Sequence, residues 1–181
     1  MADLVRTSKF LSLVLRHKPE EIGLTLDANA WADVAELIRL ANDHGVRLTP
    51  PLLDRIVAEN EKKRFAFSDD RTRIRASQGH SIAVDLDLPP TPPPELLYHG
   101  TATRFLESIR AGGLHSANRQ HVHLSPDEAT ATKVGRRHGK PVVLIIRAAE
   151  MARAGHVFYL SANGVWLTGR VPVAFITFPA P

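Results

Sequence analysis

The chain has 181 residues, which suffices for one domain with a good core or for two small lobes. It contains no cysteine, which excludes a disulfide framework and a thiolate metal site, and we find no signal peptide and no apolar run long enough for a bilayer, so we expect a soluble, cytoplasmic protein. The net charge of +4 is uneven: residues 1–88 carry 13 Lys or Arg against 14 Asp or Glu, and residues 89–181 carry 10 against 5. Such an excess fits either an anionic partner or a solubilising surface.

The first predicted helix has Ser8 as its N-cap and ends on the sequence RHKP, residues 16–19. Its apolar face is predicted to carry Phe10, Leu13, Val14 and His17. Cations in a last helical turn stabilise the helix dipole by roughly 0.3–1 kcal/mol each, which accounts for Arg16 and Lys18. His17 fits this explanation less well, because a polar ring on an apolar face needs a partner. It is therefore either a buried structural histidine or part of a site.

Two further helices and a hairpin complete the first half. A helix is predicted at about 31–41. Another is predicted to begin at Thr49–Pro50, where threonine is the N-cap and proline occupies the first helical turn. The runs 64–67 and 71–76 are separated by turn residues and predict a β-hairpin. Three helices and a hairpin indicate a winged-helix lobe over residues 1–88, although that fold alone does not establish nucleic-acid binding.

The second half is predicted to be a separate lobe. Residues 89–95 form a proline-rich linker, since a proline run enters neither a helix nor a central strand. Residues 96–181 contain six strand-like runs: LLYHG, HVHLS, PVVLIIRA, HVFYLS, GVWLT and PVAFITF. Helices are expected near 103–112 and 127–138. We therefore expect an α+β protein of two lobes, the second with a mainly antiparallel sheet.

Arginines recur at three separated places. Arg64 leads the first hairpin strand, and Arg73 and Arg75 share a face of the second, either as a solvated wing or as contacts to an RNA backbone. The segment VGRRHGK, residues 134–140, is either a helix cap or a phosphate-binding turn. These clusters and His17 could converge on one phosphate.

Histidines mark two predicted strands, in YHGT (98–101) and HVHLS (121–125). His121 and His123 share a strand face, as metal-binding pairs do, but no third ligand is evident and we expect no metal. A nucleotide is the alternative ligand, bound by histidine and by the Gly100 backbone. The chain has neither a Walker A loop nor a G-x-G-x-x-G fingerprint.

Taken together, these motifs resemble the RNA (tRNA) 2′-phosphotransferase family over nearly the whole chain. The segments that carry the resemblance are LSLVLRHKPE (11–20), KKRF (62–65), IRASQGHS (74–81), LYHGT (97–101), HVHLS (121–125), VGRRHGKPVVL (134–144) and NGVWLT (163–168). The resemblance implies a winged-helix RNA-binding lobe and an NAD-binding lobe of the ADP-ribosyltransferase type. It also implies NAD⁺ as co-substrate, no metal, and a tRNA-like RNA partner with an internal 2′-phosphate, of the kind that arises in tRNA splicing. We expect a monomer.

The reaction implied by the resemblance has two steps. The 2′-phosphate attacks C1″ of the nicotinamide ribose and nicotinamide leaves, giving an ADP-ribosylated 2′-phospho-RNA. The ribose O2″ then attacks phosphorus, which yields RNA with a 2′-hydroxyl and ADP-ribose 1″,2″-cyclic phosphate. A phosphate monoester needs no general base to act as the nucleophile, because it carries about −1.5 to −2 charge near neutral pH.

The family's catalytic residues fall by position on Arg16, His17, Arg64 and Arg137, with Arg136 as the rival of Arg137. His17 is the expected proton carrier of the second step, since imidazole titrates near neutrality.

The residues expected to contact NAD⁺ form a second set. The strict motif positions are His99, Gly100, Thr101, His123 and Val165, and the looser candidates are Gly113, Leu114, Arg119 and Ser125. Many protein-modifying ADP-ribosyltransferases carry glutamate where Val165 stands, and a carboxylate would repel a phosphate acceptor.

Two alternatives stay open at this point. One keeps the NAD-binding lobe but makes terminal phosphates of RNA or DNA the acceptor. The other is a non-enzymatic winged-helix protein that binds nucleic acid.

Overall fold

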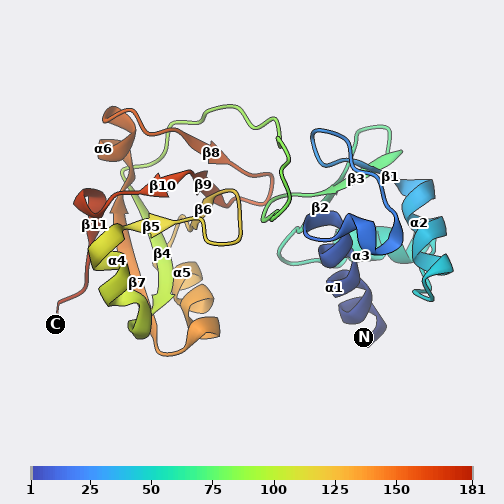
Figure 1. Cartoon of the computed structure of the whole chain (residues 1–181), viewed down its shortest axis with the longest axis horizontal. Coiled ribbons are helices and arrows are strands. Elements are labelled where there is room, and N and C mark those ends of the chain that lie inside the picture. Colours follow the sequence, from blue (N-terminus) through green and yellow to red (C-terminus); the bar gives the residue numbers. More distant parts are fainter. Residues whose placement is uncertain (1, 181) are drawn as a thin grey trace. The chain divides into compact units, whose positions relative to one another are not determined.

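The structure is a computed structural model that describes residues 2–180. The chain is a mixed α/β protein with small antiparallel sheets, and it divides into two compact units, Met1–Asp87 and Leu88–Pro181 (Figure 1). The winged-helix and ADP-ribosyltransferase-type layouts of these units stay predictions. Among the described residues, no helix combines the length and the apolar character that crossing a membrane requires.

The first helix, α1 (Ala2–Arg16), is longer than the sequence indicated, and its buried face agrees with the predicted one only in part, at Phe10 and Val14. Leu11, Val14 and Leu15 are fully buried, whereas Leu13 is 36% exposed and His17 is also exposed. Ser8 therefore lies inside the helix rather than at its N-cap, and its carbonyl oxygen accepts a hydrogen bond from Ser12 Oγ. The predicted cap was wrong because the helix already begins at Ala2, upstream of Ser8. The predicted face was wrong at Leu13 and His17 because the neighbouring elements decide which side of the helix is covered.

The other helices of the first unit are η1 (Pro19–Ile22), α2 (Val34–Asp43) and α3 (Pro50–Glu59). The predicted cap of α3 is confirmed, since Thr49 Oγ1 accepts the Leu52 N–H at 3.4 Å. Helix α2 begins three residues later than predicted, because Asp33 is its cap and accepts the Glu36 N–H at 2.8 Å.

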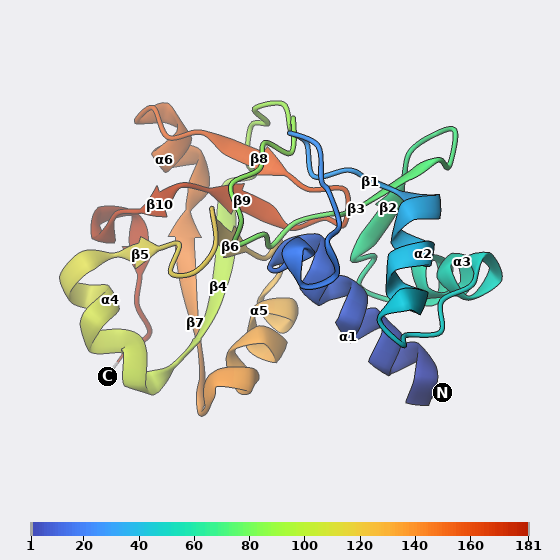
Figure 2. The same ribbon diagram turned by 45° about the vertical axis from the view of Figure 1, so that its right-hand side comes forward.

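A three-stranded antiparallel sheet completes the first unit, in the order β1 (Ala32–Asp33), β3 (Arg73–Ala76) and β2 (Phe65–Phe67). Figure 2 shows the helices grouped beside this sheet. The hairpin of β2 and β3 is as predicted, whereas β1 was not expected because only its pairing with β3 makes these two residues a strand. Side chains from helices and strands form one buried core, which includes Leu37, Leu53, Ile56, Phe65 and Ile74.

The second unit is built mainly from two three-stranded antiparallel sheets. One has the order β11 (Ile176–Thr177), β7 (Pro141–Arg147), β4 (Leu96–Ala102), and the other β6 (Val122–Leu124), β9 (Trp166–Thr168), β8 (Phe158–Leu160). Strand β5 (Leu114–His115) pairs with β10 (Arg170–Val171). The unit's own core includes Leu97, Leu124, Leu144, Ile146 and Phe158.

Helical segments connect these strands: η2 (Thr103–Phe105), α4 (Leu106–Gly112), α5 (Glu128–Gly135), η3 (Arg136–His138), α6 (Ala148–Arg153) and η4 (Val173–Phe175). The helices predicted near 103–112 and 127–138 are thus present, each with a 3₁₀ segment at one end. Helix α6 was not predicted, because its sequence continues an apolar strand.

Helix α5 lies directly against strand β4 (Figure 1). Two glycines permit this close approach. A Cβ at Gly100 would overlap the carbonyl oxygen of Ala131, and a Cβ at Gly135 would lie 2.6 Å from the carbonyl oxygen of Thr101. The packing places η3, with its two arginines, next to the end of β4.

Candidate functional site

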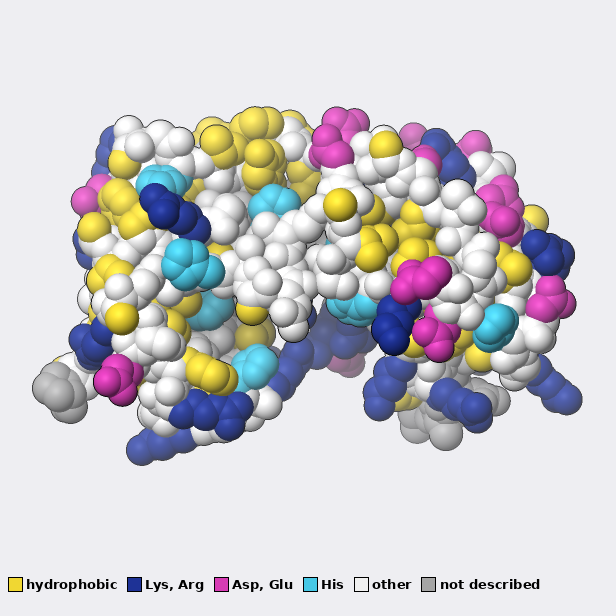
Figure 3. All heavy atoms as spheres, in the orientation of Figure 1, with side chains coloured by type: hydrophobic (Ala, Val, Ile, Leu, Met, Phe, Trp, Pro, Cys, Tyr) yellow, Lys and Arg dark blue, Asp and Glu magenta, His cyan; other side chains and the backbone are white. Residues whose placement is uncertain are grey.

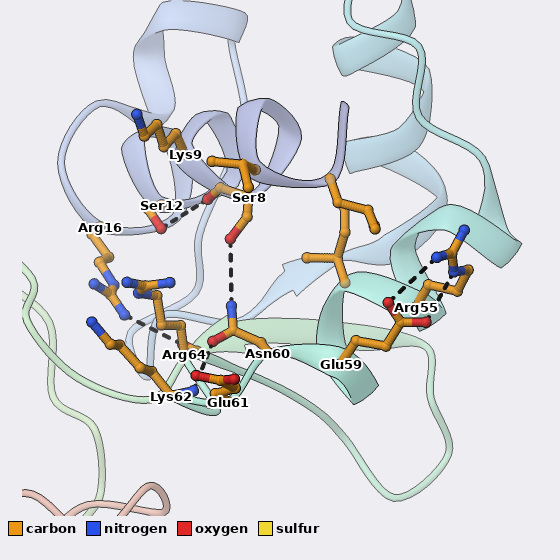
Figure 4. A pocket seen from close by; sticks show the side chains of 13 residues that line it. Ser8, Lys9, Ser12, Arg16, Arg55, Glu59, Asn60, Glu61, Lys62 and Arg64 are labelled. Carbon is orange, nitrogen blue, oxygen red and sulfur yellow. Dashed lines mark hydrogen bonds and ion pairs between the residues drawn. The ribbon is translucent and has the colours of Figure 1, made fainter. Parts of the chain in front are cut away.

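The first part of the site is the end of α1. The Arg16 carbonyl oxygen accepts a hydrogen bond from the Ser81 N–H at 3.0 Å, and Arg16 Nη2 donates to the Arg64 carbonyl oxygen at 3.5 Å. Figure 4 shows the side chains of Arg16, Lys62 and Arg64 grouped at one end of a pocket. Two arginines that are distant in the sequence are therefore held together by backbone contacts, and their charges can act on one anion.

His17 follows directly and lies on the surface, not on the apolar face of α1 as predicted. Its Nδ1 is 2.9 Å from Ser81 Oγ. Whichever of the two groups donates, Nδ1 is engaged by the hydroxyl, and this contact orients the ring. The sequence predicted that His17 needs a polar partner, and Ser81, 64 residues away, is such a partner.

His80 lies beside this cluster, and sequence reasoning gave it no role. Its side chain is 2% exposed, and neither ring nitrogen makes a hydrogen bond to another described residue. Burial, with the charges of Arg16, His17 and Arg75, lowers the pKa of His80 to about 4. The Leu15 backbone is close enough to oppose this shift weakly, although its geometry falls short of a hydrogen bond. His80 is therefore neutral at pH 7.

A pocket of about 610 Å³ extends from this cluster between α1 and α3. It is lined by Leu4, Val5, Ser8, Lys9, Ser12, Arg16, Arg55, Ile56, Glu59, Asn60, Glu61, Lys62 and Arg64. Ion pairing between Arg55 and Glu59, at 3.1 Å, neutralises one of the two carboxylates (Figure 4). The predicted catalytic residues Arg16 and Arg64 thus sit in a strongly basic hollow of the first unit.

The hairpin arginines are not part of this hollow. Arg75 lies over the ring of Trp31, 4.4 Å from the centroid, and Arg73 lies at 5.5 Å from the same ring. Arg75 Nη1 also donates to the carbonyl oxygens of Asn29 and Leu86, at 3.2 and 3.1 Å. These contacts favour a structural role for both arginines over the backbone contact with RNA that the sequence left open.

In the second unit, His99 on β4 is joined to β6. Its Nδ1 lies 3.0 Å from the His123 carbonyl oxygen, which can only accept, so Nδ1 carries the proton. Burial is the main cause that lowers the pKa of His99 below its usual value. The ring is thus neutral at pH 7, and Nε2 is an acceptor. Strands β4 and β6 are held together further by the mutual backbone hydrogen bonds of Tyr98 and Ser125, at 2.9 and 2.7 Å.

Arg119 and Arg137 belong to the same side of the second unit. Arg119 Nη1 donates to His123 Nδ1 at 2.7 Å. Burial lowers the pKa of Arg119 although much of its side chain is exposed, and the positive charge of Arg137 lowers it further. The charge of Arg137 therefore reaches Arg119, and the choice between Arg136 and Arg137 as the catalytic arginine stays a prediction.

Several predicted NAD-contacting residues also have a purely structural explanation. Gly100 is required by the packing of α5, and a Cβ at Gly113 would overlap the Val171 carbonyl oxygen. Thr101 and Leu114 are buried. Val165 precedes β9 in a tight turn, where its N–H donates to Ser161 Oγ at 3.0 Å. The residues that present polar groups beside one another are His99, His123 and Arg119.

The predicted sites thus fall into two sets, one in each unit. The first unit brings Arg16, His17 and Arg64 together, and their joint action with Arg137 on one phosphate stays a prediction. A second hollow of about 590 Å³, lined by His115, His121 and His156, belongs to the second unit and was not predicted. Figure 3 shows histidine side chains gathered on the viewed face of that unit. Within residues 2–180 there is no group of three or more His, Asp or Glu side chains that could hold a metal ion.

The basic pocket of the first unit is suited to bind an anionic ligand, which is the chemistry of a phosphate-handling protein. Comparison with known proteins makes this specific. Residues 2–170 match the model of the "RNA 2'-phosphotransferase, Tpt1 / KptA family", and the chain belongs to this family.

Curated relatives cover nearly the whole chain. A probable RNA 2′-phosphotransferase of Streptomyces coelicolor is 58% identical over 177 residues, which is 98% of this chain and 96% of that protein. One from Flavobacterium johnsoniae is 58% identical over 171 residues, 94% of each chain. One from Agrobacterium fabrum is 58% identical over 174 residues, 96% of this chain and 94% of that protein.

Proposed function

We propose that this protein transfers the internal 2′-phosphate of an RNA to NAD⁺. The products are RNA with a 2′-hydroxyl, nicotinamide and ADP-ribose 1″,2″-cyclic phosphate, formed through an ADP-ribosylated 2′-phospho-RNA. The observation that carries the proposal is the cluster of Arg16, His17 and Arg64, which the backbone holds together in a chain of this family.

The acceptor phosphate is bound by arginine. A phosphate monoester carries about −1.5 to −2 charge near pH 7, and guanidinium groups pair with its oxygens in two parallel hydrogen bonds. Arg16 and Arg64 fit this role because both line the basic pocket and one is anchored on the backbone of the other. Their charges orient the phosphate and also stabilise the negative charge that gathers on phosphorus later in the reaction.

NAD⁺ is the co-substrate, and it supplies the electrophilic C1″ with nicotinamide as the leaving group. The residues of the second unit that fit it are His99, His123 and Arg119. His99 Nε2 is an acceptor for a ribose hydroxyl or an amide N–H, because Nδ1 is committed to the His123 carbonyl oxygen. Arg119 and Arg137 supply positive charge to the same region, which suits a pyrophosphate or the acceptor phosphate.

The second step requires a proton carrier. The O2″ hydroxyl attacks phosphorus and loses its proton, and the RNA O2′ leaves and gains one. His17 is the proposed carrier of this proton, and the contact of its Nδ1 with Ser81 Oγ, which orients the ring, supports this role. Neutral His80, buried behind the cluster, adds no further positive charge beside His17.

The test is mass analysis of products from NAD⁺ and an oligonucleotide with one internal 2′-phosphate, without added metal. We expect nicotinamide, the cyclic phosphate and the 2′-hydroxyl RNA in equal amounts. An Arg64→Ala variant should lose turnover by about 100-fold or more. A stable ADP-ribosyl adduct on a terminal phosphate would instead indicate the alternative acceptor, and RNA binding with no affinity for NAD⁺ would overturn the proposal.

A further inference from the structure

The pocket between α1 and α3 is larger than one phosphate requires. Its volume of about 610 Å³ lies in the range of about 300–1,000 Å³ typical of sites for whole small ligands, whereas Arg16 and Arg64 occupy only one end (Figure 4). We infer that the rest of the pocket binds the single-stranded RNA next to the 2′-phosphate, so that it takes a flanking ribose and its phosphodiester. This inference rests on the proposed function and extends it to the path of the substrate.

Charge is the first argument. Residues 1–87 carry 13 Lys or Arg and 14 Asp or Glu, so the unit as a whole is slightly acidic. The pocket nevertheless contains five basic residues and two acidic ones, which are Lys9, Arg16, Arg55, Lys62 and Arg64 against Glu59 and Glu61. Positive charge is therefore concentrated on this one surface of a nearly neutral unit, as a polyanion requires.

The distribution of groups within the pocket is the second argument. The Ser8, Lys9, Ser12 and Arg16 side chains come from successive turns of α1, so polar side chains follow the helix away from the proposed catalytic end. Asn60 Nδ2 donates to Ser8 Oγ at 3.4 Å and ties the facing loop to the helix. Apolar surface from Leu4 and Val5 lies farther along, and Val5 is 58% exposed. Polar donors beside an apolar surface match a ribose-phosphate chain with its base.

The hairpin is the competing path, and its geometry argues against it. Arg73 and Arg75 are stacked on Trp31, Arg75 also donates to two carbonyl oxygens, and Arg73 lies 3.5 Å from Asp27. Arginines held in this way contribute to the fold and present little charge to a backbone phosphate. The pocket, in contrast, is continuous with the residues proposed to hold the 2′-phosphate.

The test compares two substrates. One is a nucleoside 2′-phosphate, which has no flanking nucleotide, and the other is an oligonucleotide with the same 2′-phosphate and several nucleotides on both sides. Affinity is measured by fluorescence anisotropy with labelled RNA at several salt concentrations, and turnover is measured separately by nicotinamide release. The affinity tests the inference and the release tests the proposed function, so the two can fail separately.

We expect Lys9→Ala to weaken binding of the flanked RNA by about five- to tenfold and to lower the slope of log affinity against log salt by about one. The loss for the nucleoside 2′-phosphate should be at least three times smaller. Arg47→Ala, a change of an exposed arginine of the same unit outside the pocket, is the matched control and should leave both affinities unchanged.

Two results would overturn the inference. In the first, Lys9→Ala binds the flanked RNA as tightly as the wild type does. In the second, it weakens binding of the nucleoside 2′-phosphate and of the flanked RNA equally, which would mean that Lys9 acts on the 2′-phosphate alone. RNAs with a flank on only the 5′ or only the 3′ side then show which strand direction the pocket accepts, since the Lys9 effect should persist with one of them.

Discussion

Ser81 is bound to two successive residues of the first helix: its Oγ lies 2.9 Å from His17 Nδ1 and its N–H donates to the Arg16 carbonyl oxygen at 3.0 Å. One serine therefore fixes both the ring of the proposed proton carrier and the backbone of the neighbouring arginine. In metal sites, removal of a group that orients a functional histidine typically lowers activity by about 10–100-fold. Ser81 orients His17 through the same kind of hydrogen bond.

Ser81→Ala should slow the second step by about tenfold, because the His17 ring loses the hydroxyl that sets its rotation and tautomer. The ADP-ribosylated RNA should then accumulate, and the pH dependence of the second step should shift. Rapid-quench assays that separate the two steps measure this effect. Ser81→Thr keeps the hydroxyl and should restore the rate. Equal slowing of both steps in the alanine variant would point to a structural role instead.

His80 predicts a pH dependence of stability. Its pKa is about 4 in the folded protein against about 6.5 in the unfolded chain, so between these values the unfolded state binds more protons. The free energy of unfolding should therefore fall as the pH is lowered from about 6.5 to about 4, by up to about 3 kcal/mol from this residue. His80→Gln, which cannot titrate, should show a shallower fall in urea denaturation measured at several pH values. Parallel curves for variant and wild type would contradict the buried neutral ring.

The two arginines of the second unit should act together. Arg119→Ala and Arg137→Ala should each lower turnover by about 100-fold, because the charge of each guanidinium reaches the same region beside His123. Arg136→Ala is the matched control, and its effect should be less than about fivefold. The measurement is the rate of nicotinamide release with saturating RNA. If Arg136→Ala is the more damaging change, the alignment of the catalytic arginine is shifted by one residue.

The glycines of β4 and α4 should differ in their tolerance of a methyl group. Gly100→Ala would place a Cβ against the Ala131 carbonyl oxygen, so it should cost about 3 kcal/mol or more of stability whether or not NAD⁺ is present. Gly112→Ala has only an ordinary contact at 3.6 Å within a helix, and it should be neutral or stabilising by up to about 1 kcal/mol. Thermal unfolding of both variants checks this prediction. Normal stability of the Gly100→Ala variant would show that α5 can move away from β4.

Where local chemistry decides the structure, the sequence was a sufficient guide. Thr49 followed by Pro50 predicted the start of α3, because a cap and the N–H that it accepts are only three residues apart. The hairpin of β2 and β3 followed from a short turn for the same reason. Helix α1 shows the limit: its periodicity identified a helix, but Leu13 is exposed and Leu15 buried, because the neighbouring elements decide which face is covered.

The sequence by itself determined the family, through the order of its motifs, and it named Arg16, His17 and Arg64 as the residues to examine. Only the tertiary structure decided that Ser81 contacts His17 and that Arg73 and Arg75 lie over the ring of Trp31. It also decided that Gly100 is needed for the packing of α5 against β4. The physical reason is separation along the chain. Caps, turns and motif order depend on residues a few positions apart, whereas a hydrogen bond over 64 residues or a helix lying on a strand exists only once the chain has folded.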